Sequence, residues 1–194
     1  MVRDKDTKSA ILEKGLEMSS HLSLEAITIG GLAKEMNMSK SGLFAHFQSK
    51  ENLQVEILNY AALHFTDYVI TPALKVERGI PRIRAIVDNW IIWGSKFNGG
   101  CIFVDATTEF NDRPGNIHNM LFGQQKQWVD VLRRIGESAI KAGDIKADTD
   151  CEQFAYDLYS LVLGYYYYDQ LLQDPKIEQR KEKSLNQFLE TYSK

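Results

Sequence analysis

Three hydroxyl residues in the N-terminal third of the chain each stand directly before a short helical run. Thr28, Ser39 and Ser49 fit the N-cap of a helix, where a side-chain oxygen accepts a backbone N–H of the first turn. The start of a helix also presents free N–H groups and a partial positive charge, which suit a phosphate. Lys40 and Lys50 directly follow two of these caps and add formal charge. The pattern therefore indicates a surface that binds a phosphate backbone.

The caps also predict two short helices joined by a tight turn. Apolar residues at helical spacing follow Thr28, a break occurs at 37–39, and a second run covers 40–47. Two helices joined in this way are what a helix-turn-helix requires. In the second helix, Leu43 and Phe47 can pack inward. The opposite face carries small or basic residues, namely Lys40, Ser41, Gly42 and Ala45. Small exposed side chains let a helix approach the base edges of a major groove.

This stretch resembles the DNA-binding domain of the TetR/AcrR family of transcriptional regulators. The family's run is close to S-K-(G/A/P)-(T/S/A)-L-Y-x-H-F-x-S-K-E-x-L, and the chain has S-K-S-G-L-F-A-H-F-Q-S-K-E-N-L over residues 39–53. The upstream pattern T-(V/I)-x-x-(I/L)-A is matched by T-I-G-G-L-A over residues 28–33. The resemblance implies a double-stranded DNA operator as partner.

The resemblance also implies roles for individual positions. The family reaches base edges and nearby phosphates at the positions of Lys40, Ser41 and Gly42, and holds the DNA backbone at those of Thr28, His46 and Lys50. Phe44 replaces the family's usual Tyr and loses a hydrogen bond to phosphate, although its ring can touch a thymine methyl group. Alternatively, His46 is a helix residue whose hydrogen bonds are made within the protein, with no contact to DNA. The expected DNA-binding residues are Thr28, Ser39, Lys40, Ser41, Gly42, Phe44, Ala45, His46 and Lys50.

Helical periodicity continues through nearly the whole chain and predicts an all-α protein of about nine helices. We expect a three-helix helix-turn-helix domain at residues 1–50 and a larger helical bundle at residues 51–194, which would bind a ligand and form the dimer. The stretch CIFVDATTEFND is ambiguous between helix and strand, and its helical neighbours favour a helix. Outside the helix-turn-helix, the expected helices cover 7–20, about 50–69, 81–96, this stretch, 116–142, 149–173 and 176–192.

The larger domain has aromatic residues in helical register. Most of them are expected in the core, and a few could line a small-molecule cavity, because such cavities combine aromatic walls with sparse polar groups. The candidate lining residues are Trp90, Trp93, Phe97, Phe103, Phe110, Trp128 and Tyr159.

Four consecutive tyrosines, 165–168, span more than one helical turn, so some of them must face solvent or another subunit. The resemblance implies a homodimer formed by the last two long helices, and the candidate interface residues are Tyr165, Tyr166, Tyr168 and Phe188. The stretch GGCIFVDATTEFNDRPG also looks like one found in a subgroup of the family, for which no ligand is implied. Arg113 within it fits a helix-end ion pair as well as a ligand contact.

Composition excludes several other classes of protein. The chain lacks a catalytic triad set, zinc-ligand spacing and a Gly-rich phosphate loop, so we expect no enzyme, metal site or cofactor. One helix face could carry three carboxylates, those of Asp105, Glu109 and Asp112. We favour their interpretation as solvated or helix-capping groups over a metal or acid–base site. No apolar run is long enough for a membrane span, the N-terminus has no signal pattern, and Cys101 and Cys151 fit a reduced, cytoplasmic setting.

The net charge of −3 sets a constraint on DNA binding, since DNA-binding domains are usually basic. Residues 1–58 hold seven Lys and Arg against eight Asp and Glu, so binding must depend on where the cations lie. We expect a homodimeric regulator, most simply a repressor, that a small-molecule effector releases from a pseudo-palindromic operator. The alternatives are a helical small-molecule-binding protein or enzyme whose helix-turn-helix is only architectural, and a regulator controlled by a protein partner.

Overall fold

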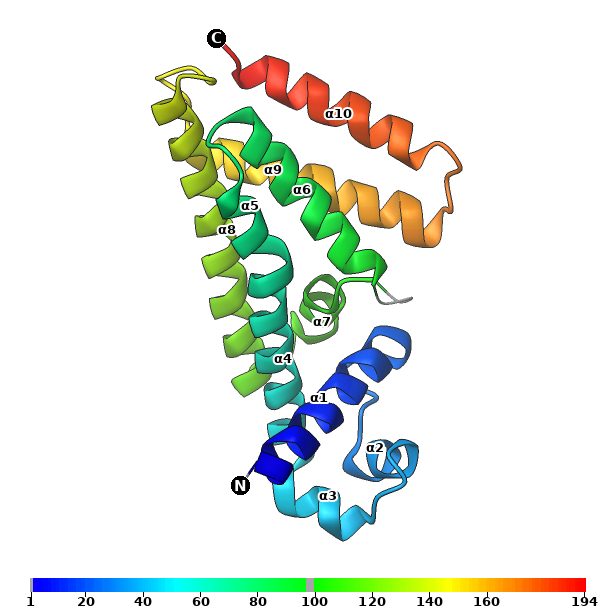
Figure 1. Ribbon diagram of the computed structural model, residues 1–194. Helices are drawn as coiled ribbons and strands as arrows, with labels where there is room; N and C mark the ends of the chain where they lie inside the picture. Colours follow the sequence, from blue (N-terminus) through cyan, green and yellow to red (C-terminus); the bar gives the residue numbers. More distant parts are fainter. Residues whose placement is uncertain (1, 97–99) are drawn as a thin grey trace. The chain divides into compact units, whose positions relative to one another are not determined.

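The computed structural model describes residues 2–96 and 100–194, with side chains from residue 7 onward (Figure 1). The predicted all-α fold is confirmed. The helices are α1 (Val2–Leu22), α2 (Ile29–Glu35), α3 (Lys40–Phe47), α4 (Lys50–Phe65), α5 (Thr71–Lys75), α6 (Ile80–Ser95), α7 (Ile102–Phe110), α8 (Asn116–Ala142), α9 (Cys151–Tyr166) and α10 (Ile177–Tyr192). Two π-helical segments, η1 (Thr66–Ile70) and η2 (Tyr167–Leu171), extend α4 and α9.

The ambiguous stretch after residue 100 is helical, as expected, and forms α7. The end predicted for the helix at about residue 69 is wrong, because the helical backbone continues through η1 into α5 and ends at Lys75. Pro72 lies in the first turn of α5, where a missing N–H removes no hydrogen bond from the helix. Proline at this position is therefore compatible with a helical backbone that continues into α5.

The chain forms two compact units. The first unit contains residues 1–65 and 95–123. Within it α1 packs against α2, α4 and α7, and α3 packs against α2 and α4. Gly15 allows the close approach of α1 to α4, because a Cβ atom there would lie 2.7 Å from a methyl carbon of Ile57. The core of this unit includes Ile11, Leu16, Leu32, Leu43, Phe47, Leu53 and Ile57, all buried.

The second unit contains residues 66–94 and 124–194. Here α9 packs against α10, and the rings of Phe154, Phe188 and Tyr192 lie 4.9–5.2 Å apart, centroid to centroid. Gly94 of α6 makes room for a ring of α9, because a Cβ atom at this position would lie 2.1 Å from Tyr166 Cε1. Small residues at helix crossings therefore determine how closely the helices of each unit pack.

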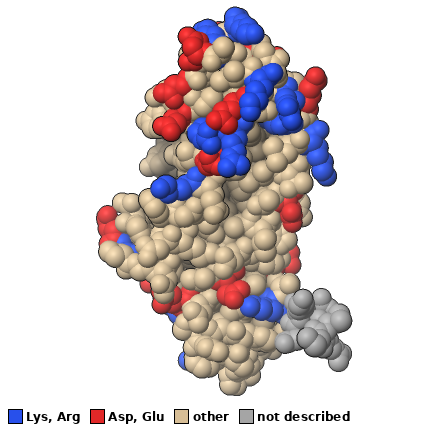
Figure 2. All heavy atoms as spheres, turned by 90° about the vertical axis from the view of Figure 1, so that its left-hand side faces the viewer, with Lys and Arg blue, Asp and Glu red and all other residues tan. Residues whose placement is uncertain are grey.

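Charged side chains in the second unit are intermixed. In the face shown in Figure 2, acidic and basic side chains gather together over this unit, and much of the remaining surface carries neither. Asp130, Arg133, Arg134 and Glu137 of α8 form ion pairs with one another. No helix within the described ranges is both long and apolar enough to span a bilayer.

Candidate nucleic-acid interface

The three predicted helix caps are confirmed. The Thr28 hydroxyl accepts the Gly31 N–H at 3.0 Å, and the Ser39 hydroxyl accepts the Gly42 N–H at 3.1 Å. The Ser49 hydroxyl accepts the Asn52 N–H at 3.0 Å. Each serine or threonine therefore satisfies one of the unpaired N–H groups at the start of its helix.

A tight turn joins α2 and α3, as the break at 37–39 predicts. Asn37 adopts the left-handed conformation, with φ of 52°, which Asn tolerates better than most residues. The Met38 N–H returns to the Ala33 carbonyl at 2.9 Å and closes the end of α2. This turn and the Ser39 cap together fix the direction in which α3 begins.

The two faces of α3 differ as the sequence predicts. Leu43 and Phe47 are buried in the first unit. Gly42 and His46 are half-buried, and the His46 ring lies 6.1 Å from that of Phe47. The exposed residues at this end are Thr28, Ser39, Lys40, Ser41, Phe44 and Ala45. Six of the nine residues proposed to contact DNA are therefore exposed to solvent, and Phe44 is the large apolar side chain among them, at 51% exposure.

Lys40 and Lys50 differ in their surroundings. Among the described residues Lys40 has no carboxylate partner, and its stem passes near Gly30, where an added Cβ would lie 3.9 Å from Lys40 Cδ and Cε. The Lys50 ammonium forms an ion pair with Glu25 at 3.0 Å. Sequence reasoning missed this partner, because Glu25 lies in the loop between α1 and α2, 25 residues earlier.

The acidic and basic residues of the subgroup motif contact that same loop. Glu109 of α7 accepts the backbone N–H of Leu24 at 3.3 Å and of Glu25 at 3.0 Å. Arg113 forms an ion pair with Glu25 at 3.7 Å. The capping interpretation of the carboxylates thus fits Glu109, although the capped group lies far away in sequence.

Asp105 lies one turn before Glu109 and has a different environment. Burial, together with the neighbouring Glu109 charge, raises the pKa of Asp105 to about 6. Within the described residues, no group of three or more His, Cys, Asp or Glu side chains is placed to bind a metal ion.

The proposed ligand-lining residues divide between the units. In the second unit the Trp90 ring lies 4.9 Å from Trp128 and 5.3 Å from Tyr159, and the Tyr159 hydroxyl donates to Gln125 at 2.9 Å. Trp93 lies 6.4 Å from Tyr68. The buried Trp90 Nε1 has no hydrogen-bond acceptor among the described residues. This unit therefore contains an aromatic cluster with few polar groups.

In the first unit, the Phe103 ring contacts Phe65 at 5.7 Å and Phe110 lies beneath the Arg113 guanidinium. Phe97 lies outside the described residues.

Two of the proposed dimer residues are largely buried within one chain. Tyr166 is 6% exposed and donates its hydroxyl to the Trp90 carbonyl, and Phe188 is 9% exposed. Tyr168 is exposed, and Tyr165 donates to Glu178 at 2.7 Å. Other large apolar side chains are exposed in α9, in η2 and just beyond it, namely Tyr156, Tyr167, Leu171 and Leu172.

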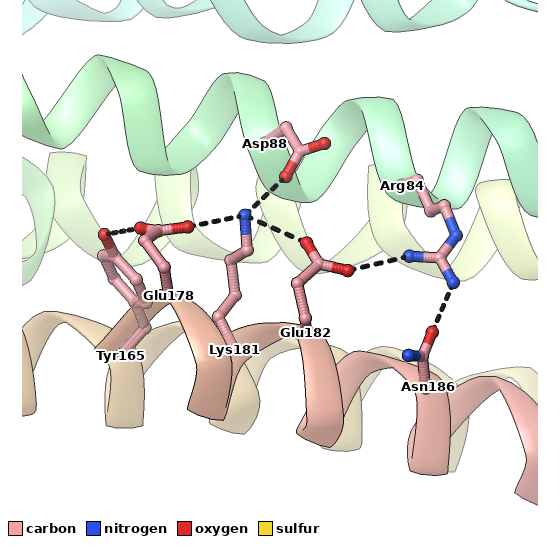
Figure 3. A network of polar contacts seen from close by, with 7 residues as sticks. All are labelled: Arg84, Asp88, Tyr165, Glu178, Lys181, Glu182 and Asn186. Carbon is pink, nitrogen blue, oxygen red and sulfur yellow. Dashed lines mark hydrogen bonds and ion pairs between the residues drawn. The ribbon is translucent and has the colours of Figure 1, made fainter. Parts of the chain in front are cut away.

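A network of ion pairs joins α10 to α6 in the second unit (Figure 3). Lys181 of α10 contacts Asp88, Glu178 and Glu182 at 3.0–3.2 Å. Burial disfavours the ammonium charge, but hydrogen bonds to these carboxylates outweigh it and raise the pKa of Lys181. Arg84 of α6 continues the network to Glu182.

Two family models match separate ranges of the chain. A family model described as bacterial regulatory proteins, tetR family, matches residues 11–57. A second model, described as tetracyclin repressor-like, C-terminal domain, matches residues 79–185. No curated protein matches the chain in sequence.

Several solved structures have the same fold. A TetR-family transcriptional regulator from Cytophaga hutchinsonii is 18% identical, with 100% of this chain and 98% of that chain covered and a TM-score of 0.87. A TetR transcriptional regulator from Chloroflexus aurantiacus J-10-FL is 17% identical, with 98% and 96% covered and a TM-score of 0.85. AibR, solved with isovaleryl coenzyme A and operator DNA, is 23% identical, with 92% and 95% covered and a TM-score of 0.72.

Proposed function

The chain belongs to the TetR family of bacterial regulatory proteins and is a DNA-binding transcriptional regulator, and we propose that it acts as a ligand-released homodimeric repressor. In this proposal each subunit places α3 in a major groove. Two-fold symmetry then gives a pseudo-palindromic operator, with half-sites separated by about one helical turn of DNA or a multiple of it.

The exposed face of α3 carries this proposal. Leu43 and Phe47 anchor the helix in the first unit, while Lys40, Ser41 and Ala45 remain exposed. These side chains are short or flexible, so they allow the backbone of α3 to approach base edges. Lys40 supplies a cation to phosphate or to a guanine edge, and the exposed Phe44 ring supplies an apolar contact for a thymine methyl group.

A binding assay tests the DNA contacts directly. Duplexes are selected from a random-sequence pool with the full-length protein, and affinity is measured by mobility shift at several salt concentrations. We expect Lys40→Ala to weaken binding and to flatten its salt dependence, because a phosphate contact releases a counterion. Lys34→Ala removes an exposed lysine from the preceding helix and is the matched control. Wild-type affinity in Lys40→Ala would contradict the assignment of α3.

The proposed dimer uses the surface formed by α9, η2 and α10. Support comes from the exposed apolar side chains there, since a patch of this kind on a monomer marks an interaction site. Tyr168→Glu should shift the protein toward monomer in size-exclusion chromatography with light scattering. Leu74→Glu places the same charge at an exposed leucine of α5 and should leave the mass unchanged. A monomeric wild type would refute the dimer.

The proposed effector binds in the second unit, near the aromatic cluster around Trp90. Aromatic walls with a polar pair, Tyr159 and Gln125, suit a largely apolar small molecule. AibR has been solved with isovaleryl coenzyme A, so short acyl compounds belong in a first screen. A ligand should raise the unfolding temperature by mass action and weaken operator binding. A ligand that stabilises the protein without changing DNA affinity would argue against release by an effector.

We propose that the protein acts in the cytoplasm by binding DNA. Regulation by binding requires no catalytic group. A variant that loses DNA binding should therefore lose regulation of a reporter gene placed behind the selected operator. Repression predicts higher reporter expression in Lys40→Ala than in wild type, whereas lower expression would indicate an activator.

A further inference from the structure

The Glu25 carboxylate lies between two cations that come from distant parts of the chain. Its Oε1 atom is 3.0 Å from Lys50 Nζ at the start of α4, and its Oε2 atom is 3.7 Å from Arg113 Nη1 after α7. All three side chains keep 40–58% of their surface exposed. Ion pairs of this exposure are weak, so one partner can exchange for another anion at low cost.

The backbone of Glu25 is held in place independently of these ion pairs. Glu109 of α7 accepts the N–H groups of Leu24 and Glu25, and the buried Gln54 side chain donates to the Leu24 carbonyl at 2.8 Å. The loop is thus held by side chains from both α7 and α4. If Lys50 moves away, these bonds still hold the Glu25 backbone, and Arg113 still contacts the carboxylate.

Arg113 is positioned to stay with Glu25. Its guanidinium lies 5.6 Å from the centroid of the Phe110 ring, which is itself buried. A hollow of about 330 Å³ adjoins the three charged groups and is lined also by Glu51, Pro114 and Ile117. This space gives the long Lys50 side chain room to turn away from Glu25.

Glu25 is ionised at neutral pH. A hydrogen bond from Lys50 lowers the pKa of its carboxyl group, and the nearby Arg113 charge acts in the same direction. A fixed negative charge next to Lys50 competes with any phosphate that approaches, and it would repel that phosphate once Lys50 has moved.

We propose that Glu25 restrains Lys50 in the DNA-free protein and releases it to an operator phosphate, while Arg113 keeps the Glu25 carboxylate neutralised. This inference rests on the DNA-binding function proposed above. Glu25 and Arg113 are then positioning residues that act through Lys50, and they have opposite effects. Glu25 weakens operator binding, and Arg113 strengthens it by compensating Glu25.

A set of variants measures these opposite signs. Operator affinity of the full-length protein is determined by fluorescence anisotropy on the selected duplex, at low and moderate salt. Glu25→Gln should bind roughly twofold to fivefold more tightly, and Arg113→Gln should bind more weakly by a similar factor. Arg113→Lys, which keeps the charge, should bind like wild type. In the Glu25→Gln background, Arg113→Gln should have little further effect, because the carboxylate that it compensates is gone.

Measurements in the Lys50→Gln background show whether Glu25 acts through Lys50 or by repelling DNA directly with its own charge. Removal of the Glu25 charge should no longer tighten binding when Lys50 is absent. Glu51→Gln, which removes an equal charge from the same hollow, should tighten binding less than Glu25→Gln does in the wild-type background. Thermal unfolding of every variant checks that all of them are folded.

Three results would overturn the proposal while DNA binding by the wild type remains. One is weaker binding in Glu25→Gln, which would make the cluster structural. Another is an undiminished loss from Arg113→Gln in the Glu25→Gln background, which would make Arg113 a direct DNA contact. The third is tightening by Glu25→Gln in the Lys50→Gln background. A wild type with no salt-dependent affinity for any duplex would instead refute the proposed function itself, and the inference with it.

Discussion

The two units of the molecule use lysine in different ways. Lys50 of the first unit has 40% of its side chain exposed and contacts one carboxylate, Glu25. Lys181 of the second unit has 11% exposed and contacts three carboxylates (Figure 3). A cation surrounded by three internal anions stabilises the packing of α10, whereas one with a single exposed partner can exchange that partner for an external anion. Composition alone cannot distinguish these two lysines, because their function depends on the number and burial of their partners.

The largest expected effect follows from removing Lys181. Lys181→Met leaves Asp88, Glu178 and Glu182 close together without their shared cation, so the free energy of unfolding should fall by about 2–3 kcal/mol. Chemical denaturation measures the loss, and Lys183→Met, an exposed neighbour in α10, is the control. Operator affinity measured where the protein is still folded should not change. A stable Lys181→Met would remove the contrast between the units.

The converse substitution in the first unit should affect binding and leave stability unchanged. Lys40 is exposed and has no carboxylate partner among the described residues, so Lys40→Ala should change the free energy of unfolding by less than about 0.5 kcal/mol. Its operator affinity should fall roughly tenfold per half-site, the usual size of a lost contact to base or phosphate. Denaturation and anisotropy on the same preparation give both values. Equal losses in the two measurements would mean that Lys40 is structural.

Asp105 of the first unit has a like charge as its neighbour, whereas the carboxylates around Lys181 in the second unit share a cation. A change of pH distinguishes these two situations. Asp105 in the first unit has Glu109 as its charged neighbour, and burial together with this like charge raises its pKa to about 6. The folded state therefore binds this proton more tightly than the unfolded state, and stability falls as the pH rises from about 4 to about 6. Above about pH 6 the ionised Asp105 carboxylate destabilises the folded state to its full extent.

Asp105→Asn should remove this pH dependence. Because the side chain is partly exposed and solvent screens its charge, we expect a gain of about 1 kcal/mol in unfolding free energy at pH 7 or above, and none below pH 4. Denaturation across this pH range measures the gain, and Asp112→Asn, at an exposed position beyond α7, is the control. An identical gain at every pH would mean that Asp105→Asn acts by packing and not by charge.

What the sequence predicted correctly was local. The caps at Thr28, Ser39 and Ser49 and the bounds of α8 depend on residues within a few positions of each other, so their patterns are visible in one dimension. The two-sided character of α3 follows in the same way from the spacing of Leu43 and Phe47.

The contacts that the sequence could not predict join distant segments. The Glu109 carboxylate caps the Glu25 backbone N–H across 84 residues, and no local pattern in either segment indicates the other. Tyr166 and Phe188 show the same limit. Their residue types suit an interface, but the close approach of Gly94 buries Tyr166 inside the unit, and Phe154 and Tyr192 cover Phe188. Only the packing decides which apolar residues of an amphipathic helix remain exposed.

The smallest expected effect compares two helix caps. Ser39 caps α3 in the first unit, and Asp150 caps α9 in the second, accepting the N–H groups of Glu152 and Gln153. Ser39→Ala should cost between about 0.5 and 1 kcal/mol of stability, and Asp150→Ala a similar amount. Ser39→Asp keeps a capping oxygen and should keep the stability, but its negative charge faces the proposed phosphate position and should weaken operator binding. Asp150→Ser should change neither property. Thermal unfolding and anisotropy on the four variants decide the matter: if Ser39→Asp binds the operator like wild type, the start of α3 does not face phosphate.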